Sequence, residues 1–481
     1  MENVKPTPQA EAPKPAVDEN VVLYVDPAKR IPLVLGMFAV LFLGALTTSA
    51  LNTILPVIAK GIGGLDLFSL VFVAATFGGV IAAPIAGGFI NVVNRRNLFL
   101  IASGLIIAIQ ILHVFVPTMG VMIAVRALSA IGLSFATVSG LSIIAFIFPA
   151  KERIRWVGFF GTMLASGSFF GPLLGGFLAG GIGWQWFFYL TAAIAMVGFV
   201  IAAINLPKDN KVNRGAVKLD WGGLVLYAVL LLAAVTVISF AGKAFNWLSI
   251  ATLGLIVVVV IAGFAFVKVE QKKDARAMMP MSLFRDSRFT LPFLAQFLAT
   301  GAKVPFYIYL SLYLQKVLGY ATTDAALVVT LFGAAAVVFS LFFAPFAART
   351  GLVKQSAFAA LVVLTAISII AALAGFFSFY NVPMLIVMCI IWGCASTMTN
   401  TTFTMIVQTI LPKEVIGIAT GNIQLALSLG SMIPVAIYGA IINGYGANLN
   451  TGINVTYIVG AALGVFGIVI ISMIKMPKKV G

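Results

Sequence analysis

Two positively charged residues interrupt long apolar runs in this 481-residue chain. Arg126 lies within the apolar run 119–148, nearer its start, and Lys303 lies near the middle of the run 289–315. Holding a cation inside a membrane costs at least about 2.5 kcal/mol, so each should face a partner or a water-filled cavity. The chain has 14 acidic residues, and we expect none of them at mid-membrane depth. The two cations are therefore candidates for binding an anionic group, or for bracing the fold.

Uncharged polar residues are also dense in the apolar runs. Because polar side chains are costly in contact with lipid, we expect these to face the protein interior. There they can line a cavity or form hydrogen bonds between helices, and the sequence favours neither over the other. The candidates for lining a substrate cavity, besides the two cations, are Asn52, Tyr307, Asn400, Asn422 and Gln424.

Three other titratable residues are candidates for proton exchange. Asp66 and Asp324 each stand at the start of an apolar run, where the helix dipole stabilises an acid without any further role. His113 is the only histidine and lies near the end of the run 98–117. Histidine titrates near neutral pH, although a lone histidine is more often a packed polar residue. These three residues form a group that experiment can test together.

The composition around these residues defines the class of protein. Residues are 61% hydrophobic and 9% charged, against about 25% charged in soluble domains. Apolar runs of this length predict an all-α polytopic membrane protein. Cys389 and Cys394 lie within one apolar run and match neither a disulfide framework nor a zinc site. We expect no metal and no cofactor.

The apolar runs predict fourteen membrane spans. Two short basic turns, within GGFINVVNRRNLFL and APFAARTGLVKQSA, follow similar small-residue helix ends and suggest two related halves. Paired halves of this kind hold a substrate near the midplane between them. The predicted divisions are a disordered tail (1–30), a six-helix half (31–206), two extra spans with polar linkers (207–288), a second six-helix half (289–475) and a short tail (476–481).

Lysine and arginine residues are concentrated in alternate loops. Lysine and arginine stand at the start of the first run (Lys29 and Arg30), in the two linkers and at the C-terminus, whereas the intervening loops hold only Lys60, Lys243 and Lys316. Cytoplasmic loops carry such an excess, so both termini are predicted to be cytoplasmic. The net charge of +16 is then explained by topology, and no nucleic-acid partner is needed. We expect a monomer in the cell (plasma) membrane.

The stretch 160–180, FGTMLASGSFFGPLLGGFLAG, is apolar and rich in glycine. Its glycines fall near one face of a helix, and Pro172 should bend that helix. A stripe of glycine permits close approach of a second helix. The stretch is either ordinary packing or a hinge, and we expect Gly171 and Gly175 to contact the opposite half. The hinge candidates are Gly167, Gly171, Pro172, Gly175 and Gly176.

Four segments together carry a family resemblance. They are GSFFGPLLGG at 167–176, VRALSAIG with Arg126, LDWGGLVL with Asp220, and LYLQKVLGY with Tyr320. With these segments in the family's order along the chain, the chain resembles the fourteen-helix drug:proton antiporter branch of the major facilitator superfamily. The resemblance covers about residues 31–475. It implies two six-helix halves with two extra central helices, and export of amphipathic compounds by alternating access, usually driven by protons.

The chain departs from this family at two places. The loop after the second span usually carries Asp followed by Gly-Arg-Lys, whereas here the corresponding residues are Asn91, followed by Asn94, Arg95 and Arg96. Thr47 stands where the first helix often carries Asp. The inner gate and the proton site of the family are therefore both in question for this chain.

The sequence leaves several functions open. The leading one is a secondary transporter that exports amphipathic small molecules, drug-like or lipid-like, with proton coupling. The alternative is a carrier or flippase for anionic or zwitterionic amphiphiles without proton antiport. It is favoured by the presence of Arg126 and Lys303 in apolar runs that hold no acid at similar depth. A membrane enzyme would need a nucleophile, base or metal cluster, which the sequence does not suggest. A sensor or scaffold would be expected to carry an added soluble domain.

Overall fold

The structure is a computed structural model that describes residues 25–89, 93–148, 150–207, 221–241, 245, 246, 248–273, 281–411, 416–446 and 448–476. Asn91, Asp220 and most of the two predicted tails lie outside these ranges. The elements are α1 (Pro27–Ile62), η1 (Leu65–Leu67), α2 (Phe68–Phe89), α3 (Arg95–Val114), α4 (Met119–Ile147), α5 (Ala150–Gly181), α6 (Gln185–Asn205), α7 (Trp221–Phe240), α8 (Ile250–Lys273), α9 (Met281–Arg285), α10 (Ser287–Lys316), α11 (Thr322–Thr350), α12 (Val353–Phe376), α13 (Val382–Ile410), α14 (Ile416–Gly444) and α15 (Leu449–Met473).

Polar caps explain where several helices begin. Asp26 accepts a hydrogen bond from the Ala28 amide, and proline follows it at the first helical position. This cap begins α1 at Pro27, a few residues before the apolar run that was predicted to start near residue 31. Thr118 caps α4 in the same way. At the other end of a helix, Gly351 takes a left-handed conformation after α11, which glycine adopts without steric cost.

The helices agree with the predicted all-α polytopic membrane fold. Among the described residues, thirteen helices are long and apolar enough to cross a membrane. The glycine-rich α5, 32 residues long, is a further long helix that is not among these thirteen. Fourteen crossings therefore remain a prediction. The second of the polar linkers predicted within 207–288 is partly helical, because α8 continues to Lys273 and α9 follows.

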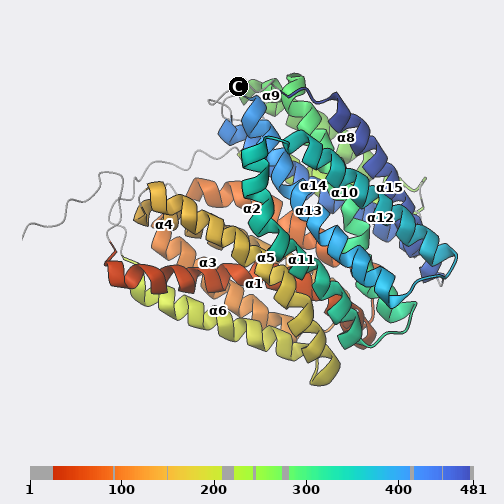
Figure 1. Cartoon of the computed structure of the whole chain (residues 1–481), viewed down its shortest axis with the longest axis horizontal. Coiled ribbons are helices and arrows are strands. Elements are labelled where there is room, and N and C mark those ends of the chain that lie inside the picture. Colours follow the sequence, from red (N-terminus) through yellow and green to blue (C-terminus); the bar gives the residue numbers. More distant parts are fainter. Residues whose placement is uncertain are drawn as a thin grey trace, which may run out of the picture.

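The long helices pack as two groups (Figure 1). In the N-terminal helix group (α1–α6), α1 packs on α5 and α6, while α4 packs on α2 and α3. In the C-terminal helix group (α10–α15), α15 packs on α10 and α12, while α13 packs on α11 and α12. The groups meet chiefly where α5 lies against α11 and α2 against α14. The α7–α8 pair attaches beside them through contacts of α7 with α14 and α2.

The apolar core differs between the two ends of this bundle. At the end that carries η1, here called the η1 end, one buried cluster contains residues of both helix groups, such as Ile54, Phe68, Leu310 and Val435. At the opposite end, where α1 begins, each group has a separate cluster. The two groups thus share a core at the η1 end and have separate cores at the α1 end, in line with their divergence in Figure 1.

Candidate functional site

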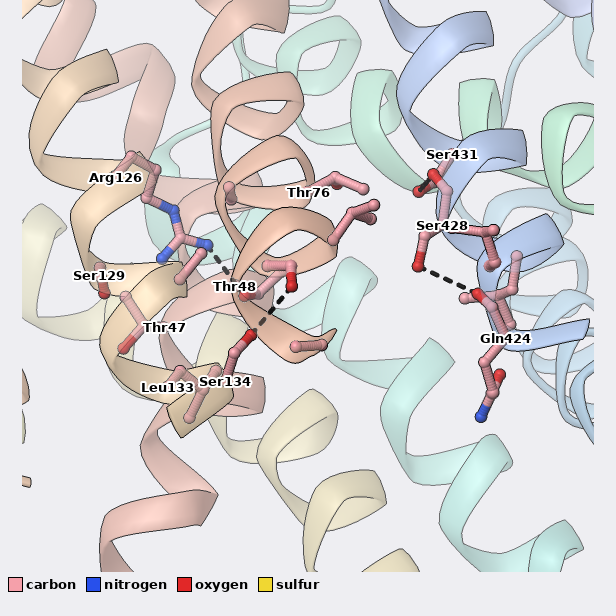
Figure 2. A pocket seen from close by; sticks show the side chains of 18 of the residues that line it. Thr47, Thr48, Thr76, Arg126, Ser129, Leu133, Ser134, Gln424, Ser428 and Ser431 are labelled. Carbon is pink, nitrogen blue, oxygen red and sulfur yellow. Dashed lines mark hydrogen bonds between the residues drawn. The ribbon is translucent and has the colours of Figure 1, made fainter. Parts of the chain in front are cut away.

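A cavity of about 920 Å³ lies between the two helix groups, and we call it the Arg126 cavity. Its walls come from α1–α4 on one side and from α14 on the other. Figure 2 shows Arg126, Ser129 and Leu133 on one side, facing Gln424, Ser428 and Ser431 across the space. Most of the wall is apolar, with hydroxyl and amide groups spaced along it. Such a surface suits a ligand that is itself partly apolar.

A second cavity of about 770 Å³, the Lys303 cavity, adjoins the first. It is lined by α1, α2 and α5 of the N-terminal group and by α10, α11, α13 and α14 of the C-terminal group. Both cavities are lined by Thr48, Ala75, Thr76, Leu427 and Ser431. The two predicted cavity cations therefore come from opposite helix groups and line adjoining spaces between them.

Arg126 is 3% exposed and is held by the helix beside it. Its Nη2 donates a hydrogen bond to the Thr48 hydroxyl (2.9 Å), which joins α4 to α1 (Figure 2). Its Nε has no hydrogen-bond partner among the described residues. Tyr307 of the opposite group and His113 of α3 lie within electrostatic reach of the guanidinium. Arg126 is thus both a brace and a wall of its cavity.

Lys303 is 8% exposed, and its Nζ donates a short hydrogen bond to Oδ1 of Asn400. An amide oxygen stabilises the ammonium but does not neutralise it. Within the described ranges, no aspartate or glutamate lines either cavity. Glu270 is buried, but it lies near the end of α8 and lines neither cavity. The positive charge of the site is therefore not balanced by a neighbouring carboxylate.

An aromatic wall stands beside Lys303 in the same cavity. The rings of Tyr307 and Trp392 are stacked, with centroids 5.4 Å apart and planes at 6°. Phe332 packs on Trp392 with a centroid distance of 4.8 Å. The indole Nε1–H of Trp392 is buried and finds no acceptor in the part of the chain that the structure describes. Lys303 and three aromatic residues, one of them with an unpaired N–H, thus line the same cavity.

The predicted cavity residues are distributed between these two spaces. Asn422 and Gln424 line the Arg126 cavity, and Tyr307 and Asn400 line the Lys303 cavity. Asn52 lines neither cavity. It is fully buried within electrostatic reach of Tyr307, but its amide does not meet hydrogen-bond geometry there. Asn52 is thus a buried polar residue at the contact between the groups.

Several lining residues were not identified from the sequence. They are the small hydroxyl residues Thr48, Thr76, Ser129, Ser134, Ser428 and Ser431. Single serines and threonines are common in membrane helices because their hydroxyls bond to the preceding turn, as Thr76 does to the Phe72 carbonyl. The cluster Thr47–Thr48–Ser49 in one apolar run is a signal that could have identified Thr48.

The three predicted proton-exchange residues do not come together. His113 is fully buried and stacks on Phe188 (4.6 Å, 8°), and its Nδ1–H donates to the Ile109 carbonyl (2.9 Å). It does not line either cavity. Asp66 and Asp324 are exposed at the starts of η1 and α11, in the positions expected for residues stabilised by helix dipoles.

Thr47, which replaces the family's aspartate, belongs to a buried polar cluster. Gln110 donates from Nε2 to the hydroxyls of Thr47 (3.2 Å) and Thr191 (2.8 Å), so α1, α3 and α6 are joined through one amide. Its Oε1 has no hydrogen-bond partner among the described residues. At this place the chain has neutral hydrogen bonds and no carboxylate.

The glycines of α5 contact two different helices. Gly171 and Gly175 lie against α1, where added Cβ atoms would meet the Leu46 carbonyl oxygen (2.6 Å) and Ala50 Cβ (3.0 Å) respectively. The expectation that these two glycines contact the opposite half was therefore wrong. The contact with the opposite group lies on the next face, where Gly176 is pressed against Ala326 of α11. Consecutive positions on a helix point about 100° apart, so neighbouring glycines serve different neighbours.

Gly167 and Pro172 complete the predicted hinge segment. Gly167 packs on Ala45 of α1, and its carbonyl accepts a hydrogen bond from the Ser49 hydroxyl (2.8 Å). Pro172 lies within α5 and lines the Lys303 cavity. The segment therefore joins α1, α11 and one cavity wall. Whether it bends during function stays a prediction.

The predicted inner gate loop is described only in part. Asn91 lies outside the described residues. Arg95 and Arg96 begin α3, which Asn94 caps by accepting a hydrogen bond from the Arg96 amide. Arg96 also donates from Nη2 to the Ala203 carbonyl near the end of α6 (2.9 Å). This arginine thus holds the α1 end of the N-terminal group together.

The family follows from comparison with known sequences. The sequence profile of the Major Facilitator Superfamily matches residues 37–435, with a second, overlapping match at residues 293–480. The chain belongs to the Major Facilitator Superfamily, and it is a multi-pass membrane transporter. The resemblance noted in the sequence is thereby confirmed at the level of the superfamily.

Individual relatives of the chain are also transporters. The multidrug transporter protein MdtP of Bacillus subtilis is 24% identical over 442 residues, covering 90% of this chain and 79% of the relative. The multidrug resistance protein Stp of Mycobacterium tuberculosis is 26% identical over 416 residues, covering 85% and 74%. A crystal structure of the peptide transporter POT in complex with sulfate superposes with a TM-score of 0.66 at 17% identity, covering 92% of this chain and 94% of that one. These matches are transporters, which confirms the expectation of a transporter and not a membrane enzyme.

Proposed function

We propose that this protein is a secondary transporter that exports amphipathic small molecules by alternating access. The observation that carries the proposal is the pair of adjoining cavities between two helix groups that share a core only at the η1 end. Rocking of the groups about the cavities would expose the site to one side at a time. The mostly apolar walls with dispersed polar groups support an amphipathic ligand.

The basic loops assign a direction to this arrangement. With both termini cytoplasmic, the η1 end faces outward and the α1 end faces the cytoplasm. The structure then corresponds to a state that loads substrate from inside, with the outer end closed. The names of the relatives, MdtP and Stp, support multidrug export across the cell membrane as the transport reaction. We expect the monomer to be the transporting unit.

Proton coupling belongs to the proposal, and an uncoupled carrier is its alternative. Antiport by relatives of this type usually relies on a carboxylate within the membrane. Here the cavities lack one among the described residues, and Gln110 binds Thr47 where an acid is usual. This observation favours the alternative, or coupling through a different group such as His113.

Transport into everted membrane vesicles tests the proposal. Fluorescent or labelled amphiphiles, one neutral and one of each charge sign, would be added with and without an imposed proton gradient. We expect accumulation of at least one amphiphile above vesicles that lack the protein. Stimulation by the gradient supports antiport, and equal transport with and without it supports the uncoupled carrier. No transport of any probe by correctly inserted protein would contradict both.

A further inference from the structure

The Lys303 cavity combines features that the general class of multidrug transporter does not require. A buried ammonium, a buried indole N–H without an acceptor and a stacked aromatic pair line one space between the helix groups. We propose that Lys303, Trp392 and Tyr307 form a binding site for small amphipathic anions with a flat aromatic body. This inference rests on the proposed function and names the substrate class of its site.

The charge of the site favours an anion. Lys303 donates to the neutral amide of Asn400, so its charge is solvated but not cancelled. Arg126 adds a second positive charge in the adjoining cavity, where it donates a hydrogen bond to the neutral Thr48 hydroxyl. Since no carboxylate lines either cavity among the described residues, a bound carboxylate or sulfonate would supply the missing counter-charge.

The donors of the site fit the same ligand. An anionic oxygen accepts hydrogen bonds readily from an ammonium and from an indole N–H. The Trp392 Nε1–H is buried and has no acceptor within the described ranges, and a buried donor without a partner is uncommon in folded proteins. In the proposed site, the bound anion is the acceptor that this N–H lacks.

The aromatic wall favours a ligand with a flat ring, and Lys303 beside it disfavours a cationic one. Aromatic faces alone attract organic cations. The ammonium of Lys303 in the same cavity opposes that attraction, whereas it leaves stacking of an uncharged ring on Tyr307 and Trp392 unaffected. A volume of about 770 Å³ falls within the range of drug-sized sites, about 300–1,000 Å³, which favours a small molecule over a two-chain lipid.

Binding of matched probes to the purified protein tests the inference. Naphthylacetate, naphthylacetamide and naphthylethylamine share one ring system and differ in charge. We expect naphthylacetate to bind at least about tenfold more tightly than the amine. Lys303→Gln should remove this preference and leave binding of the neutral amide within about twofold. Lys268→Gln is the matched control, because Lys268 is exposed and lies over Phe264, away from both cavities.

A second variant separates the anion site from a general loss of folding. Trp392→Phe keeps an aromatic ring but removes the N–H, so it should weaken naphthylacetate several-fold more than naphthylacetamide. Monodisperse elution of each variant shows that it remains folded. Equal binding of the three probes by the wild type, or an unchanged preference in Lys303→Gln, would overturn the inference while export of neutral amphiphiles still supports the proposed function.

Two other outcomes are also decisive. If a short-chain phosphatidylglycerol displaces labelled naphthylacetate at lower concentration than unlabelled naphthylacetate does, the site prefers lipid headgroups, and the small-anion assignment is wrong. If the folded wild type binds and transports none of the three probes, the proposed function and this inference both fail. Anion preference lost in Lys303→Gln, with weak displacement by the lipid, confirms the inference.

Discussion

Asn443 of α14 donates a hydrogen bond from Nδ2 to the backbone oxygen of Asp66 in η1 (2.6 Å), and so joins the two helix groups at the η1 end. Close by, Gly439 is packed so tightly on Ser69 that no side chain fits between them. Gln315 of α10 adds a hydrogen bond from Nε2 to the Thr53 carbonyl of α1 (2.8 Å). These contacts close the η1 end of the space between the groups.

The first prediction is that Gly439→Leu opens this closure. The leucine side chain would displace Ser69 and separate α14 from α2, since packed interiors do not absorb extra atoms without movement. Thr53→Cys, placed in a background without Cys389 and Cys394, reports the change, because Thr53 is fully buried at this end. We expect its labelling by an impermeant maleimide to rise in Gly439→Leu.

Gly444→Leu provides the control for this experiment. Gly444 lies on the same helix, and an added Cβ there meets nothing within 4 Å. Labelling that stays equally slow in both leucine variants would mean that the Gly439 contact does not hold the η1 end closed.

The second prediction separates the two contacts of the α5 glycines. Gly171→Leu should destabilise the folded protein, because its side chain would enter the α1–α5 contact, and overpacking costs about 1–3 kcal/mol. Gly176→Leu should instead separate α5 from Ala326 of α11 and disfavour the closed η1 end. Thermal unfolding of the purified protein measures the first effect, and labelling of Thr53→Cys measures the second.

Gly181→Leu is the matched control, since nothing lies within 4 Å of an added Cβ at this end of α5. If Gly171→Leu unfolds at the wild-type temperature and transports normally, then α1 does not pack against this glycine as closely as described. If Gly176→Leu leaves Thr53→Cys protected, the α5–α11 contact does not control opening.

Most of the fold could be predicted from the sequence, because membrane helices are encoded by the length of their apolar runs. The predicted run 119–148, for example, matches α4 (Met119–Ile147) to within one residue at each end. The start of α1 was missed because its cap, Asp26, precedes the apolar run within a polar segment. Partners of the glycines were missed for a different reason. Spacing identifies the face of a helix, but it does not identify the helix that covers this face, as Gly171 and Gly176 illustrate.

The site was predictable where burial of charge is costly. Arg126 and Lys303 could be identified because a cation in an apolar run must face a partner or a cavity. In the structure, both line the space between the helix groups. The position of His113 against Phe188, and of Trp392 beside Tyr307, depends on how distant helices pack. Neither contact leaves a periodic signal in the sequence.

The third prediction concerns topology. Single cysteines at positions 10 and 480, which lie outside the described residues, should react with an impermeant reagent only from the cytoplasmic side. The reason is the excess of lysine and arginine in the loops that share this side with the termini. Labelling of intact cells compared with everted vesicles measures it. Reaction of either position in intact cells would show that the assigned orientation is wrong.

The fourth prediction concerns coupling. Asp66→Asn and Asp324→Asn should leave gradient-driven transport intact, because both side chains are exposed at helix starts and line neither large cavity. His113→Gln tests the remaining candidate: loss of the gradient effect with downhill exchange retained would assign coupling to this buried ring, which lines neither cavity. Vesicle transport at matched substrate gradients, with and without a proton gradient, distinguishes the variants. Undiminished stimulation in the triple variant would exclude all three residues.

The last prediction separates the two roles of Arg126. Its Nη2 bond to Thr48 joins α4 to α1 within the N-terminal group, and hydrogen bonds to charged groups contribute about 1.5–3 kcal/mol. Arg126→Gln and Thr48→Val should therefore each lower the free energy of unfolding, and the double variant should lose less than the sum of the two. Chemical unfolding of the wild type, the two single variants and the double variant in detergent measures this coupling.

Binding of the probes tests the second role. If Arg126 only braces the fold, Arg126→Gln and Thr48→Val will each weaken naphthylacetate and naphthylacetamide to the same extent. We expect Arg126→Gln alone to weaken the anion more than the neutral probe, because its charge lies in the wall of the cavity. An equal loss for both probes would assign Arg126 to bracing alone and leave Lys303 as the cation of the site.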